Sequence, residues 1–123
     1  MELFILIKTN GEFEEVFIDT ENNFLDECYK LIGCELIEIC VPNFQKQDTN
    51  IRFIVDESGK LNDQKFNPLA TFLYNRADIL FGNVLVCKAG FDIYGEYRIL
   101  GLEDYESDEI MDFLKKIPKV LLK

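Results

Sequence analysis

The sequence contains no histidine at any of its 123 positions. Histidine is the usual general base near neutral pH, the group that activates serine and cysteine nucleophiles, and a common ligand of protein-bound metals. Its absence excludes Ser-His-Asp and Cys-His catalysis and every histidine-ligated metal site. A glycine-rich phosphate loop is also missing, because the Ser-Gly-Lys sequence at 58–60 lacks the upstream glycine of a P-loop. We therefore predict a protein that is not an enzyme, with no catalytic residues, no metal and no cofactor.

Long apolar runs are lacking as well. No segment approaches the ~20 apolar residues that a membrane-spanning helix needs. The apolar residues 3–7 follow no basic leader and precede no small-residue cleavage site, which favours a buried first strand over a signal peptide. We therefore expect no contact with membranes and a location in the cytosol.

Cysteine occurs four times, but not in a pattern that is typical of metal binding. Cys28, Cys34 and Cys40 are separated by five residues each, and Cys87 stands alone. The cysteine pairs of zinc sites usually lie about two to four residues apart. Since no export signal points to an oxidising compartment, we predict reduced, mostly buried cysteines that pack as small apolar side chains.

Positive charge is scarce: 13 basic side chains face 23 acidic ones, and the formal net charge is −10. The excess lies in two segments, residues 1–27 and residues 92–112, which each carry eight acidic side chains and one basic one. A field of this sign repels phosphate backbones, so direct binding to nucleic acid is disfavoured. The same field speeds the encounter with a basic protein, including one that itself binds nucleic acid. The alternative interpretation is that the acidity only keeps the protein soluble.

The pattern of apolar residues predicts one α+β domain that spans residues 1–123. We expect a mostly antiparallel sheet of about five strands with the two main helices on one face, in the order ββαββαβ(β)α. On the third strand, the face with Ile37, Ile39 and Val41 is expected to pack on the core. Ser107 is predicted to cap the last helix. The expected strands cover residues 2–8, 12–19, 34–41, 51–55 and 79–88, with a weak strand within 90–102, and the expected helices cover residues 22–32, 67–74 and 107–117.

An acidic run near the C-terminus is the first candidate site. Closely spaced carboxylates on a rigid frame can imitate the phosphate array of a duplex and so contact a nucleic-acid-binding protein. Two alternatives stay open, namely a solvated loop with a helix start, or a carboxylate site that binds Mg²⁺ for hydrolysis. The candidate partner-binding residues are Glu103, Asp104, Tyr105, Glu106, Asp108 and Glu109.

Arginine, which occurs only three times, suggests a second candidate site. Its planar guanidinium is the usual group for holding a phosphate or a carboxylate. If the arginines converge in space, they would bind a small anionic nucleotide signal; otherwise each pairs with a neighbouring acid. The candidate ligand-binding residues are Arg52, Lys60, Asn67, Thr71, Arg76 and Arg98.

Three segments carry a resemblance to a known family. Residues 24–38, FLDECYKLIGCELIE, combine a helix, a glycine stop and an Ile-Glu strand, with one glycine where the family usually has two. Residues 54–61, IVDESGKL, are followed by Asn67 and by Ala-Thr at 70–71, and residues 78–86, DILFGNVLV, are similar to a strand with a Gly-Asp-Val-Leu-Val core. Together these segments resemble a family of small domains of unknown function that is common in bacteriophages and plasmids.

The resemblance implies a mobile genetic element in a bacterial host, where small proteins often disable host defences by stoichiometric binding. We therefore expect a non-enzymatic inhibitor of a host anti-phage defence system. Its acidic surface would engage a host protein, such as a nuclease or another nucleic-acid-binding defence protein. The alternatives are a sponge that sequesters a small anionic nucleotide signal and a carboxylate/Mg-dependent hydrolase. A homo-oligomer is compatible with each of them.

Overall fold

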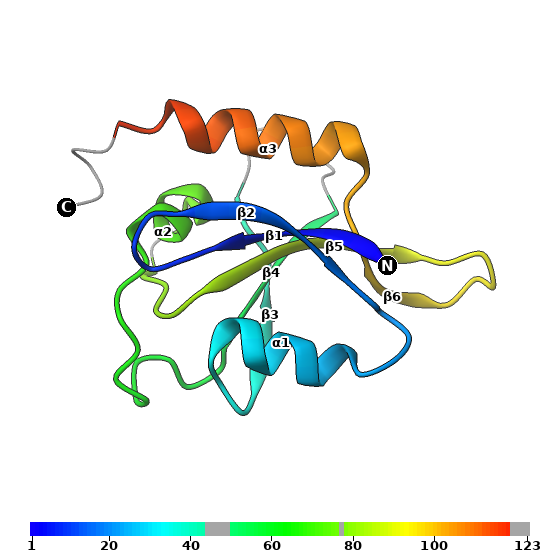
Figure 1. The fold of residues 1–123 in the computed structure, drawn as a ribbon, viewed down its shortest axis with the longest axis horizontal. Coiled ribbons are helices and arrows are strands. Elements are labelled where there is room, and N and C mark those ends of the chain that lie inside the picture. The colour runs from blue at the N-terminus through cyan, green and yellow to red at the C-terminus, as the bar shows by residue number, and fades with distance from the viewer. Residues whose placement is uncertain (44–49, 77, 119–123) are drawn as a thin grey trace.

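The computed structural model describes residues 1–43, 50–76 and 78–118, which form a sheet flanked by helices (Figure 1). Its class and element order confirm the predicted antiparallel α+β fold with the order ββαββαβ(β)α. Within these ranges, no helix is long and apolar enough to cross a membrane. The elements are β1 (Glu2–Ile7), β2 (Phe13–Ile18), α1 (Phe24–Ile32), β3 (Ile37–Cys40), β4 (Ile51–Asp56), α2 (Pro68–Tyr74), β5 (Val84–Phe91), β6 (Tyr97–Leu100) and α3 (Asp104–Lys116).

The sheet is antiparallel throughout and has the strand order β2-β1-β5-β4-β3, with β6 paired to β5. The long strand β5 is its centre, because residues 84–86 pair with β1 while residues 88–91 pair with β6. A single bridge between Leu3 and Leu102 then brings the chain from β6 past β1 to α3. The hairpin of β5 and β6 consequently extends beyond the body of the sheet (Figure 1).

Both faces of the sheet are covered by helices. Ile5 and Ile7 of β1 pack in one core with side chains of α2 and α3, whereas Phe4 and Leu6 pack in a second core with side chains of α1. Figure 1 shows α3 above the sheet and α1 below it. The prediction that the two main helices share one face is therefore wrong. The continuous apolar run of β1 was the available signal, since a strand with one solvated face alternates between apolar and polar residues.

Three local predictions also differ from the structure. Helix α3 begins at Asp104 rather than after Ser107, and Ser107 is buried inside the helix. Strand β5 begins at Val84 rather than near residue 79, because the residues before it form only an isolated bridge between Phe66 and Phe81. On β3 the expected core face is largely exposed, since this strand is an edge of the sheet. Of the three apolar residues on that face, Ile37 packs against the core between the sheet and α1, whereas Ile39 and Val41 are exposed.

Candidate functional site

At the start of α3, two of the predicted partner-binding residues make contacts that stabilise the fold. The backbone N–H of Glu103 donates to Oε1 of Glu106 at 2.8 Å, which satisfies a backbone donor at the helix start. The ammonium of Lys88 on β5 lies 3.3 Å from Glu103 Oε1 and 3.2 Å from Glu106 Oε1. Burial alone would lower the pKa of Lys88, but the hydrogen bonds and charges of the two glutamates outweigh burial and raise it. These contacts fix the beginning of α3 to the central strand.

The remaining predicted residues on α3 are exposed to solvent. They are Asp104, Tyr105, Asp108 and Glu109, and Asp112 adds a further exposed carboxylate one turn later. Asp104, Asp108 and Asp112 recur at every fourth position, so they form a row along one side of the helix with a rise of about 6 Å from each to the next. This row of aspartates is an exposed, negatively charged side of α3 that a partner can reach.

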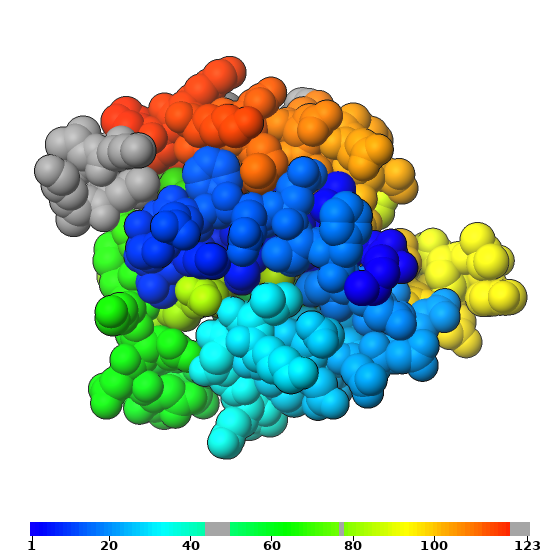
Figure 2. Space-filling view, viewed as in Figure 1, coloured from blue at the N-terminus to red at the C-terminus, as the bar shows by residue number. Residues whose placement is uncertain are grey.

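Strand β2 lies against this side of α3. The hydroxyl of Ser107 donates to Glu15 Oε2 at 2.6 Å, a contact between residues 92 positions apart in the sequence. Asp104 lies one turn before Ser107 on the helix surface, so the carboxylate of Glu15 lies beside the beginning of the row. In the space-filling view, the surface of α3 adjoins that of β2 (Figure 2). We define the acidic surface as Glu15, Asp104, Tyr105, Asp108 and Asp112, which combines the two acidic segments of the sequence.

Two of the predicted ligand-binding residues stabilise the fold instead of facing solvent. Asn67 is fully buried, and its side chain accepts from the N–H of Ala70 at the start of α2. The same side chain donates to the carbonyls of Ile7 and Gly82, at 3.0 and 2.9 Å. Thr71 accepts a hydrogen bond from the backbone of the segment before β5. All the polar atoms of the Asn67 amide are thus engaged within the protein.

The three arginines make separate contacts. Arg52 donates to the carbonyl of Ile51 and makes a further interaction, while Arg76 donates to the carbonyl of Val41 at the end of β3. Arg98 on β6 holds the loop between β2 and α1 through two hydrogen bonds. These contacts belong to different elements, and none of these hydrogen bonds links one arginine to another; nothing in the described geometry gathers the arginines around one ligand.

Lys60 lines a groove of about 360 Å³ beside β3 and β4. It forms an ion pair with Asp78 at 3.0 Å, and the other charged groups of the lining are the carboxylates of Glu38, Asp56 and Glu57. None of the other five predicted ligand-binding residues lines this groove. Because its lining is negative overall, the groove gives no support to the binding of an anionic nucleotide.

The cysteines are free, and three of them have strongly raised pKa values. Burial raises the pKa of Cys28 and of Cys87 to about 12 and that of Cys40 to about 11. Such thiols are protonated near neutral pH and are poor nucleophiles. In the part of the chain that the structure describes, no group of three or more carboxylates and thiols is placed to hold a metal ion.

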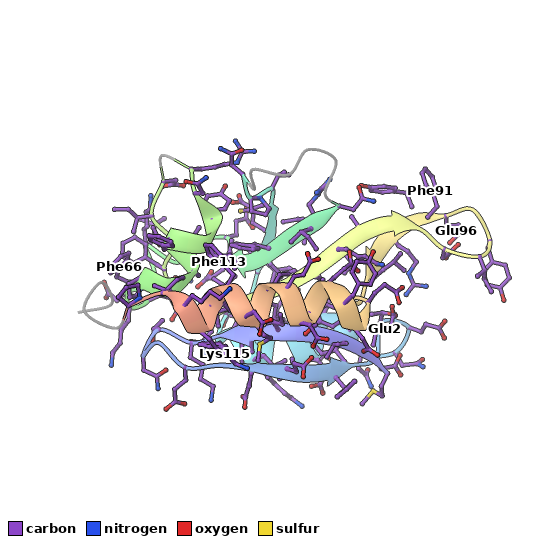
Figure 3. All side chains as sticks on the ribbon, turned by 90° about the horizontal axis from the view of Figure 1, so that it is seen from above. Glu2, Phe66, Phe91, Glu96, Phe113 and Lys115 are labelled. Carbon is purple, nitrogen blue, oxygen red and sulfur yellow. The ribbon has the colours of Figure 1, made fainter. Side chains whose placement is uncertain are left out.

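The tip of the β5–β6 hairpin is a second surface, which the sequence-based interpretation did not identify. Phe91, Ile93, Tyr94 and Tyr97 are all exposed there, and the hairpin extends away from the body of the protein (Figure 3). Two features of residues 91–97, FDIYGEY, could have revealed it: large apolar residues on both sides of a turn, and a glycine in the turn itself. Reading the segment as a weak strand obscured both features.

The chain was compared with known proteins in three ways. No curated protein and no solved structure matches it. A family model described as a domain of unknown function, DUF3846, matches residues 1–116, and this match runs from before β1 to the end of α3. The expectation of a family of unknown function is thereby confirmed, and the chain belongs to the DUF3846 family.

Proposed function

We propose that this chain is a non-enzymatic binding protein of a mobile genetic element, and that it inhibits a host anti-phage defence protein in the bacterial cytosol. The target has a basic surface that normally holds nucleic acid, as a nuclease does. The observation that carries the proposal is the meeting of β2 and α3, which concentrates two acidic segments of the sequence in one surface. The three segments that resemble phage- and plasmid-borne domains supply the biological setting.

The acidic surface suits a basic partner for electrostatic reasons. Its aspartates stand on a helix whose start is tied to the central strand by Lys88 and whose side is tied to β2 by Ser107. Fixed charges of one sign steer a positive surface into contact and need little reorganisation when the contact forms. Because the same charges repel phosphates, a partner bound here cannot hold its nucleic acid at that surface.

Competition with DNA tests the proposal. Complexes are captured from a lysate of bacteria with active phage defences, the bound protein is identified by mass spectrometry, and that protein is purified. We expect the chain to displace fluorescent duplex DNA from the purified partner, and the affinity to fall as the salt concentration rises. Replacing Asp104, Asp108 and Asp112 with lysine should weaken the binding at least about 10-fold.

A matched control separates this surface from net charge. Glu21, Glu35 and Glu57 are exposed and lie outside the acidic surface, so the triple variant Glu21→Lys, Glu35→Lys, Glu57→Lys makes the same change in charge elsewhere. This control should keep most of the affinity, and thermal unfolding should show that both variants are folded. Equal losses in the two variants, or undiminished displacement by the α3 variant, would contradict the proposal.

A further inference from the structure

The hairpin tip exposes more apolar surface than its fold requires. The exposed fractions are 72 % for Phe91, 92 % for Ile93, 82 % for Tyr94 and 59 % for Tyr97. Since aromatic side chains each present about 150–250 Å², the tip offers several hundred square ångströms of exposed apolar surface. Patches of this size on a soluble protein mark interaction sites more often than chance exposure.

The tip is held in one shape by hydrogen bonds that the side chain and the backbone of Asp92 make with the residues that follow it. Asp92 Oδ1 accepts from the N–H groups of Tyr94 and Glu96, at 2.8 and 3.0 Å. The backbone N–H of Asp92 donates to the carbonyl of Glu96, and the N–H of Gly95 donates to the carbonyl of Asp92. Gly95 has a φ of 79°, which glycine adopts without strain. Phe91 and Tyr97 then contact each other edge to face across the hairpin, 5.2 Å between ring centroids.

Such a tip has the properties of a binding anchor. Rigid aromatic side chains dominate the binding energy of protein interfaces, because they bury a large area and lose little conformational freedom. A flexible loop would have to be ordered on binding, whereas this turn is already ordered by four hydrogen bonds. Its shape, a narrow projection, fits a pocket rather than a flat surface.

The charges of the tip restrict what can cover it. The charged side chains within residues 91–97 are those of Asp92 and Glu96. Asp92 is mostly shielded and lies 3.8 Å from the guanidinium of Arg98, so the exposed charge of the tip is the carboxylate of Glu96. Tip-to-tip pairing of two copies would bring the Glu96 carboxylates together within chains of net charge −10. An anionic membrane would repel the tip in the same way, since the tip carries no lysine to bind anionic lipids. The complementary occupant is a protein pocket with apolar walls and basic groups at its rim.

The base of the hairpin lies next to the start of α3, which carries most of the acidic surface. Three residues separate the end of β6 from the start of α3, and Lys88 at the base of the hairpin binds both Glu103 and Glu106. One partner can therefore touch the hairpin and α3 together. We propose that the hairpin tip inserts into an apolar pocket with a basic rim, on the same protein that binds the acidic surface. This inference rests on the proposed function.

Site-specific cross-linking tests this inference. Tyr94 is replaced by the photoreactive residue p-benzoylphenylalanine in the full chain, the complex with the purified partner is irradiated, and the cross-linked peptides are identified. We expect cross-links to apolar residues of the partner that have lysine or arginine beside them. Cross-links between two copies of this chain, or none in a complex that has formed, would overturn the inference.

Kinetics distinguish the two surfaces. The variant Phe91→Ser, Tyr94→Ser should weaken the binding on the order of 30-fold, mainly through faster dissociation that depends little on salt. The charge-reversed α3 variant should act mainly on association and on its salt dependence. A control with Leu25→Ser and Leu61→Ser, both exposed elsewhere, should bind as the unchanged chain does.

The outcomes separate the inference from the proposed function. Loss of binding in the serine variant but not in the α3 variant would support the anchor and contradict the electrostatic function. The reverse result would support the function and overturn the anchor. Co-flotation of the unchanged chain, but not of the serine variant, with vesicles of equal parts phosphatidylcholine and phosphatidylglycerol would overturn the protein pocket in favour of a membrane.

Discussion

At the scale of single residues, a side chain that looks like a ligand-binding group can be fully used by the fold. Asn67 was recognisable from the sequence as a helix cap, because Pro68 follows it at the first helical position. Its amide was also a candidate for ligand binding. What the sequence does not reveal is that this amide donates to carbonyls of Ile7 and Gly82, which are distant in sequence. Tertiary hydrogen bonds of this kind have no local pattern.

Replacing Asn67 with alanine should therefore destabilise the protein strongly. The substitution removes a helix cap, which contributes about 1 kcal/mol, and leaves two buried carbonyls without their donor, at about 1 kcal/mol or more each. We expect the free energy of unfolding to fall by about 3 kcal/mol, measured by urea denaturation. Asn22→Ala, at an exposed site, should change it by less than about 0.5 kcal/mol. A similar small change for Asn67→Ala would contradict this account.

The buried thiols lead to a prediction about reactivity. Because burial raises the pKa values of Cys28 and Cys87 to about 12, hardly any thiolate exists at about pH 8 in the folded state. We expect iodoacetamide to modify these two cysteines only through transient unfolding, so that modification accelerates with urea. Mass spectrometry of the peptides resolves each site. Rapid modification of Cys87 without urea would be incompatible with its observed burial.

At the scale of elements, the existence of each helix and strand can be predicted from the sequence more accurately than its first and last residues. The Asn-Gly turn between β1 and β2, Gly33 after α1 and Pro68 at the start of α2 are strong local signals, and each lies at the boundary of an element in the structure. The start of α3 was placed at Ser107 because serine is a preferred cap. The structure begins the helix at Asp104, where Glu106 supplies the capping acceptor and Ser107 bonds β2. The preference of serine for a helix cap was therefore outweighed by the hydrogen bond that Ser107 makes with Glu15.

The link between β6 and α3 depends on a glycine. A Cβ atom on Gly101 would lie 2.5 Å from Glu2 Cβ and 2.8 Å from Leu3 N, so β1 and this link would have to separate. We expect Gly101→Ala to lower the free energy of unfolding by about 2 kcal/mol or more. At Gly90 on β5, a Cβ would meet only Leu100 Cδ1 at 3.4 Å. Gly90→Ala should therefore be close to neutral in the same urea titration, and equal effects would refute the steric explanation.

At the scale of the whole molecule, the acidic surface results from topology. Each acidic segment was visible in the sequence, as were most residues of the α3 row. Their meeting was not, because Glu15 and Ser107 come together only when β2 pairs with β1 and α3 packs over the same face of the sheet. The aromatic tip was missed for a related reason: the three-dimensional projection of the hairpin leaves its apolar side chains exposed and outside both cores of the protein.

Collecting these charges in one place should make stability depend on salt. Repulsion among the carboxylates of α3 and β2 opposes folding at low ionic strength and is screened at about 0.1 M salt, where the Debye length is about 10 Å. We expect Tm to rise by a few degrees between low and moderate sodium chloride concentrations, as measured by circular dichroism. The α3 charge-reversed variant should show a smaller rise. If the Tm of that variant rose by the same amount, the repulsion would have to arise from charges outside the acidic surface.

The central position of β5 also has a consequence for the order in which the protein folds. The hairpin β1–β2 and the pair β3–β4 are both complete before residue 84 is synthesised, yet neither pairs with the other; each is joined to the sheet only by β5. Until β5 leaves the ribosome, the inner edges of β1 and β4 remain unpaired and their apolar side chains remain without a core. Assembly of the sheet is thus a late, long-range event, and the nascent chain depends on residues 84–91 to convert two separate hairpins into one domain.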